Sequence, residues 1–82
     1  MDEIVIRHCQ LSKSYRARAA RVAALVKLET GIEPRLAPGR LAEFAVRVNG
    51  ATVARKGWLK LPPDEHVLAA VRDALCGRES FR

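Results

Sequence analysis

The sequence predicts one small α/β domain in which a four-stranded mixed sheet carries both helices on one face. Three observations lead to this class: a β-branched run near the start, two stretches with the apolar spacing of helices, and an alternating stretch around an Asn-Gly pair. The 82 residues allow one modest core, since a chain of this size buries only about 60% of the surface its unfolded form exposes. We expect the domain to occupy residues 1–77 and a tail to follow at 78–82.

The first strand is predicted at residues 3–7, EIVIR, where β-branched side chains are bounded by polar ones. From Ser14 to about Glu29 the apolar residues recur every three or four positions, which places them on one face of a helix. They are Tyr15, Ala19, Val22 and Val26. Ser12 or Ser14 suits the N-terminal cap of this helix, and Gly31 suits its C-terminal cap.

Two further strand signals surround a tight turn. Residues 32–39 contain two prolines, so a strand there must be short or lie at a sheet edge. The stretch FAVRVNGATVARK predicts a hairpin, because Asn49-Gly50 readily supplies the two positive φ angles of a type I′ turn. A regular ladder would pair Val46 with Val53 and Phe44 with Arg55. The core face would then carry Phe44, Val46, Val48 and Val53, and the opposite face Ala45, Arg47, Thr52 and Ala54.

A second helix is predicted from Asp64 to Cys76, with Gly77 as its C-terminal cap. Its apolar stripe comprises Leu68, Val71 and Leu75, with Val67 and Ala74 beside it. A crossover helix between the first two strands makes them parallel, and the hairpin adds two antiparallel strands. Two helices cannot easily cover both faces of four strands, so we expect one face of the sheet to stay open.

Composition excludes several classes of protein. Hydrophobic residues make up 49% of the chain and charged residues 29%, which is too apolar for a disordered chain. We find no secretory signal and no transmembrane run, and therefore expect a soluble, cytoplasmic protein. Cys9 and Cys76 are too few for a disulfide framework. With His8 and His66 they form no zinc-binding spacing, so we expect no metal.

The order strand, helix, strand, strand, strand, helix, with a cysteine after the first strand, resembles the selenoprotein W-like family, also called Rdx. The matching stretches span nearly the whole chain: IVIRHCQLS, LAPG, FAVRVNGATVARK and LPPDEHVLAAVRDAL. The hairpin is the most specific of them. The resemblance implies a thioredoxin-like fold and thiol-based redox chemistry at Cys9.

Two departures from the family pattern stand out. Ser12 occupies the position at which the family carries its second cysteine or selenocysteine, so the motif is CxxS in place of CxxC. The glycine-rich approach to the hairpin is replaced by RLAEF, with Ala45 where glutamate is usual. Serine cannot resolve a mixed disulfide, because a dithiol site depends on a neighbouring thiol for that step. The resemblance therefore implies a site reduced to one thiol.

Cys9 has two interpretations: a small buried hydrophobe at a strand end, or a reactive monothiol. A position before a helix N-terminus, flanked by cationic groups, should lower the pKa of a thiol. The supporting residues in this interpretation are Arg7, His8, Lys13 and Arg16. Such a thiol can form a mixed disulfide with glutathione or a protein thiol. Cys76 is the one candidate within the chain to resolve it, and we do not expect the two cysteines to approach within bonding range.

The other candidate residues also have a simpler interpretation. His8 is a general base or, more commonly at a strand end, a solvated or hydrogen-bonded residue. Ser12 is more typical of a helix cap than of a catalyst. Trp58 is either a partner-binding anchor or a residue that closes one end of the core.

The net charge of +6 raises the question of a nucleic-acid partner. The stretches 4–28 and 44–63 contain ten Lys and Arg residues and no acidic one. Aromatic residues are scarce, however, and Phe44 is assigned to the core, so a stacking platform for single strands is not supported. Nucleic acid is therefore the least favoured of three functions.

The favoured function is that of a thiol-disulfide oxidoreductase with Cys9 as nucleophile, with no resident cofactor and with glutathione as thiol co-substrate. The alternative is a redox-inactive interaction module on the same fold, which binds another protein or a second copy of itself through the open sheet face or Trp58. We expect no membrane partner.

Overall fold

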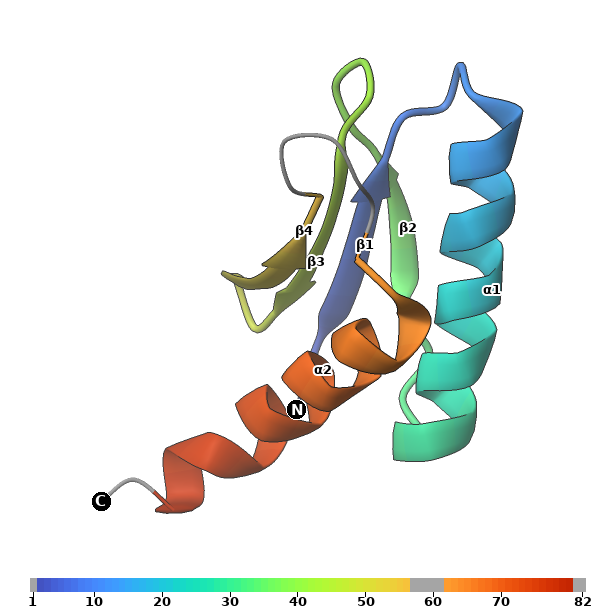
Figure 1. Cartoon of the computed structure of the whole chain (residues 1–82). Helices are drawn as coiled ribbons and strands as arrows, with labels where there is room; N and C mark the ends of the chain where they lie inside the picture. The colour runs from blue at the N-terminus through green and yellow to red at the C-terminus, as the bar shows by residue number, and fades with distance from the viewer. Residues whose placement is uncertain (1, 57–61, 81–82) are drawn as a thin grey trace.

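The computed structural model describes residues 2–56 and 62–80 (Figure 1). Trp58 lies outside these residues, so its two interpretations stay predictions. The elements follow one another as β1 (Ile4–His8), α1 (Lys13–Thr30), β2 (Arg35–Pro38), β3 (Phe44–Val48), β4 (Ala51–Arg55) and α2 (Asp64–Ser80). This is the predicted order, and each strand starts within a few residues of the expected position.

The sheet is mixed, with the strand order β2-β1-β3-β4. β1 runs parallel to β2 and antiparallel to β3, and β3 runs antiparallel to β4. The proline-bounded strand β2 lies at one edge, where Pro38 at its end costs no ladder hydrogen bond. The four-stranded mixed sheet with two helices confirms the predicted fold class.

The core lies between one face of the sheet and the two helices (Figure 1). Ile4 and Ile6 of β1 alternate with the half-buried Val5 and Arg7, so only every second residue of the strand enters the core. The fully buried residues from all layers are Ile4, Ile6, Ala19, Val22, Val26, Phe44, Val46, Val67 and Val71. Both helices therefore cover the same face of the sheet, as expected.

Helix α1 has the predicted caps. Ser12 is the N-terminal cap, with extended backbone angles, and its Oγ accepts a hydrogen bond from the Tyr15 N–H at 3.3 Å. Ser14 lies inside the helix and pairs its hydroxyl with that of Ser12 at 3.1 Å. Gly31 ends the helix with a φ of 77° and donates its N–H to the Lys27 carbonyl at 2.8 Å.

The hairpin has the predicted turn but a different register. Asn49 and Gly50 both have positive φ, 52° and 89°, as a type I′ turn requires. Beyond the turn a β-bulge lies opposite the Val46-Arg47 step, so Val46 pairs with Ala54 and Ala45 pairs with Arg55. The predicted pairing of Val46 with Val53 is therefore wrong. The bulge adds one residue to β4, which turns Ala54 into the core and leaves Val53 half-buried.

Helix α2 continues beyond its expected end. It runs to Ser80, so Gly77 is not its C-terminal cap. A glycine costs a helix only about 1 kcal/mol relative to alanine, and the Arg-Glu pair that follows it favours helix. The fully buried line of α2 is Val67 and Val71, with Leu68, Ala74 and Leu75 packed beside it. The tail predicted at 78–82 is thus helical as far as Ser80.

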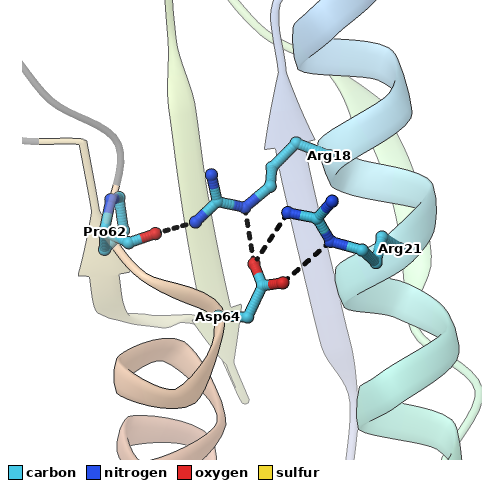
Figure 2. Close-up of polar contacts among 4 residues, drawn as sticks. All are labelled: Arg18, Arg21, Pro62 and Asp64. Atoms are coloured by element: carbon cyan, nitrogen blue, oxygen red, sulfur yellow. Dashed lines mark hydrogen bonds and ion pairs between the residues drawn. The ribbon is translucent and has the colours of Figure 1, made fainter.

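Two arginines of α1 hold the start of α2 (Figure 2). The Asp64 carboxylate lies 2.6 Å from Arg18 Nε and 2.8 Å from Arg21 Nε. Arg18 also donates to the Pro62 carbonyl. Burial alone would raise the pKa of the Asp64 carboxyl, but the hydrogen bond from Arg21 and the charges of both arginines lower it below its ordinary value. This contact joins the middle of α1 to the first residue of α2.

Candidate functional site

Cys9 lies where three segments of the chain meet. It directly follows the last residue of β1, and the short loop that it begins leads to the Ser12 cap of α1. Its N–H donates to the Glu43 carbonyl at 2.8 Å, in the connection between β2 and β3. In the same connection, Gly39 donates its N–H to the His8 carbonyl at 2.9 Å. Both main-chain hydrogen bonds are made by the peptide group between His8 and Cys9, which joins the end of β1 to the β2–β3 connection.

The β2–β3 connection ends in a tight turn that presents its backbone to Cys9. The Glu43 N–H donates to the Arg40 carbonyl at 3.0 Å, and the Glu43 carboxylate accepts from the Arg40 N–H at 2.7 Å. Ala42 has a φ of 60°, a left-handed conformation that is costly for a residue with a Cβ. Gly39 packs closely against this turn, since a Cβ there would lie 2.8 Å from Glu43 Oε1 and would require the Glu43 side chain to move.

Backbone N–H groups lower the pKa of the Cys9 thiol below its ordinary value. The largest contribution is the hydrogen bond from Ala42. Burial acts in the opposite direction, and the N–H groups of Leu11 and Ser12 together with the charge of Arg16 add to the lowering. The lowering of the Cys9 pKa agrees with the prediction. The main donor, however, comes from the β2–β3 connection, which the sequence did not indicate.

Cys9 is only 2% exposed. The residues that border it are far more open: Leu11 in the loop before α1 is 83% exposed, and Leu41 in the opposite turn is 78% exposed. Cys9 is thus buried at the end of β1, outside the main cluster of core residues, and the two loops next to it carry exposed leucines.

The predicted supporting residues surround Cys9 unevenly. Arg16 donates to the Gln10 carbonyl at 2.5 Å and lies near enough to act on the thiol. Arg7 instead points to Glu43, with 3.7 Å between guanidinium and carboxylate. His8 is 4% exposed, and its Nδ1 lies 3.3 Å from the Cys9 carbonyl oxygen. Lys13 is exposed at the first position of α1.

This arrangement separates the predicted residues into two groups. Ser12 and Arg16 act on the Cys9 thiol, Ser12 through its backbone and Arg16 through its charge. His8 lies within hydrogen-bond distance of the Cys9 carbonyl, which is the hydrogen-bonded alternative given above, although the residue is buried and not solvated. Sequence reasoning did not identify Ala42, Glu43, Leu11 or Leu41. An alanine in a left-handed turn and a leucine on a loop have no signature in a single sequence.

Cys76 does not bond to Cys9. Both thiols are free, Cys9 buried and Cys76 exposed. Figure 1 shows the loop between β1 and α1 at the opposite end of the molecule from the C-terminal part of α2, which contains Cys76. Among residues 2–56 and 62–80, no group of His, Cys, Asp or Glu side chains is arranged to hold a metal ion. Neither of the two described helices is long and apolar enough to cross a membrane.

Two solved structures share this architecture. A protein from Bordetella parapertussis is 26% identical, with a TM-score of 0.77 over 89% of this chain and 96% of its own. A selenoprotein W-related protein from Vibrio cholerae is 20% identical, with a TM-score of 0.76 over 90% of this chain and 96% of its own. No protein-family model and no curated protein matches the sequence. The chain therefore has the thioredoxin-like α/β fold of the selenoprotein W-related protein.

Proposed function

We propose that the protein is a thiol-disulfide exchange protein of the selenoprotein W type that acts through Cys9 alone. The Cys9 thiolate attacks the disulfide of oxidised glutathione or of a protein. One Cys9–sulfur bond forms, the original disulfide breaks, and its other sulfur leaves as a thiolate that takes a proton from water. A second thiol from solution then attacks the mixed disulfide, which returns Cys9 to its reduced form.

The observation that carries this proposal is the convergence of amide donors on one sulfur. Hydrogen bonds from Ala42, Leu11 and Ser12 favour the anionic form, and the thiolate is the species that reacts with disulfides. The structure from Vibrio cholerae supports the same type of protein, since it is a selenoprotein W-related protein that shares the fold of this chain. Ser12 in the place of a second thiol makes the exchange depend on an external thiol, and the glutathione pool of the cytoplasm would provide it.

Mass spectrometry of the protein after exposure to oxidised glutathione tests this proposal. We expect one added glutathione on Cys9, removed again by reduced glutathione. Cys76 is an internal reference, because it is exposed and lies far from the amide donors. Labelling of a Cys76→Ser variant should persist at the wild-type rate, and labelling of a Cys9→Ser variant should be slower. A folded protein labelled only on Cys76 contradicts the proposal.

The second candidate, a redox-inactive interaction module, is favoured by one observation. Leu11 and Leu41 are largely exposed on either side of a cysteine that is itself covered. Exposed apolar residues in neighbouring loops are typical of a protein-binding surface. In this function the Cys9→Ser variant keeps its partner, whereas a Leu11→Ser, Leu41→Ser variant loses it. Loss of binding on Cys9→Ser alone contradicts the module.

A further inference from the structure

The sheet face that no helix covers is rich in arginine. Four arginines, one from each strand, lie on this face: Arg7, Arg35, Arg47 and Arg55. We call this set the arginine face. Its residues are related by the strand register, since Val5 pairs with both Arg35 and Arg47, and Ala45 pairs with both Arg7 and Arg55. Paired residues point to the same side of a sheet, so all four belong to one surface.

The four side chains form a zigzag across the sheet. Adjacent strands lie about 5 Å apart, and residues two apart on a strand are separated by about 7 Å. In the order Arg35, Arg7, Arg47, Arg55, each arginine is thus diagonal to the next on a neighbouring strand, at a step of roughly 8 Å between backbone positions. A regular row of guanidinium groups of this kind suits a ligand with regularly repeated negative charge.

The positive charge on this face is only partly balanced. Glu3 lies 3.2 Å from Arg35, but both side chains are well exposed, and exposed pairs of this kind exchange readily for other partners. Glu43 lies 3.7 Å from Arg7. Among the described residues, Arg47 and Arg55 have no carboxylate partner, and Nε of Arg47 is buried with no hydrogen-bond acceptor. The two arginines without a carboxylate partner leave uncompensated positive charge on this face, which attracts a polyanion.

The residues between the arginines decide which anion fits. They are small: Val5, Ala37, Ala45 and Thr52. A protein partner is usually anchored by buried aromatic or other large apolar residues, and single-stranded nucleic acid by bases stacked on aromatic rings. The described part of this face carries neither kind of anchor. What it offers is bidentate donors for phosphate, and the chain has a net charge of +6.

We propose that the arginine face binds the phosphate backbone of double-stranded nucleic acid without sequence preference. The scarcity of aromatic residues argues against single-stranded nucleic acid, whose bases would stack on aromatic side chains. It does not argue against a duplex, in which the bases stack on one another. The strand register places arginines that are far apart in the chain on one face of the sheet, and this arrangement is not visible in the linear sequence. Binding at this face is separate from the chemistry of Cys9.

The experiment is a titration of a fluorescent 30-base-pair DNA of mixed sequence at several salt concentrations. Four phosphate contacts predict a slope of about −3.6 for log affinity against log salt, a loss of about 10²-fold between 50 and 200 mM. The Arg47→Gln, Arg55→Gln variant should lower that slope to about −1.8. The matched control is Lys13→Gln, Lys27→Gln, which removes two charges from α1 and should keep the wild-type slope.

Several results would overturn this proposal. They are an absence of binding at 50 mM salt, an equal change of slope in the α1 control, and equal affinity for poly-glutamate of the same charge. Tighter binding of the single strand than of the duplex would also contradict it. Circular dichroism checks that the double variant is folded. Arg55→Gln alone is an independent variant, because Arg55 is exposed on the edge strand β4. It should change the slope by about 0.9. Cys9→Ser should bind DNA as the wild type does.

Discussion

The N–H of Cys9 donates to the carbonyl of Glu43 at 2.8 Å, and this bond ties the end of β1 to the turn that follows β2. The backbone of Ala42, in the same turn, is the largest influence that lowers the pKa of the Cys9 thiol. The chemistry of the cysteine therefore depends on a loop that lies 33 positions further along the chain.

Replacement of Ala42 by glycine should stabilise the protein. Ala42 has a φ of 60°, and the left-handed conformation costs a non-glycine residue about 1 kcal/mol, which glycine does not incur. We expect the free energy of unfolding in urea to rise by roughly 0.5–1 kcal/mol. The backbone N–H remains, so the rate at which Cys9 is alkylated should change little.

The matched control for this variant is Ala20→Gly, at an exposed position within α1. There glycine should destabilise by about 1 kcal/mol, because alanine is the better helix former. A loss of stability in both variants would show that Ala42 is not strained in solution.

Alkylation of Cys9 should begin at a lower pH than that of an ordinary thiol. The amide donors lower the pKa of Cys9 in the folded protein, and unfolding removes them. The resulting stabilisation is fully present above the unfolded pKa and is lost as pH falls through the folded pKa. The free energy of unfolding of the wild type relative to Cys9→Ser should therefore increase as pH rises toward about 8.5, the pKa of a free thiol.

Two measurements check this prediction: the rate of iodoacetamide labelling against pH in Cys76→Ser, and urea unfolding of both proteins at several pH values. Half-maximal labelling at the pH of an unperturbed thiol, or a stability difference that is constant with pH, would contradict it.

Removal of the Ser12 hydroxyl should destabilise the protein through the helix cap. Its Oγ accepts the Tyr15 N–H at 3.3 Å, and loss of such a cap costs about 1 kcal/mol. Ser14→Ala serves as the control, because it removes the contact between the two serine hydroxyls and leaves the cap from Ser12 to Tyr15 in place. Ser12→Cys should restore the CxxC motif, and mild oxidation should then produce an intramolecular disulfide that shields Cys9 from alkylation. Continued labelling of Cys9 after oxidation would show that the two side chains cannot meet.

Local pattern predicted the elements of this fold well. The α1 face, the Asn49-Gly50 turn and the edge strand β2 each follow from spacing or turn chemistry within a few residues. The bulge in β4 could not be predicted, because Val53 and Ala54 are both apolar and either can face the core. The end of α2 was missed because glycine is a frequent helix stop but not an obligatory one.

The candidate site was only half predictable. Cys9 and Ser12 stand out as residues at a strand-to-helix junction, and the pKa direction followed from that position. The turn that supplies Ala42 and Glu43 is distant in sequence and reaches Cys9 through main-chain hydrogen bonds. Every residue except proline has a backbone N–H, so the sequence does not mark which of these groups act on Cys9. Only the folded arrangement of the two loops shows it.

The contact of Asp64 with Arg18 and Arg21 should make stability fall in acid. Burial opposes ionisation of Asp64, but the two arginines outweigh it and lower the pKa of the carboxyl in the folded state (Figure 2). The stabilisation is present above about pH 3.9, the ordinary value for aspartate, and is lost as pH falls through the folded pKa. Asp64→Asn should cost about 1–2 kcal/mol at pH 7, measured by urea unfolding. The wild-type carboxyl is itself protonated in strong acid, so the difference in free energy of unfolding between the two proteins should shrink as pH is lowered from 5 to 2. A difference that stays constant over this range would show that the ion pairs contribute nothing to folding.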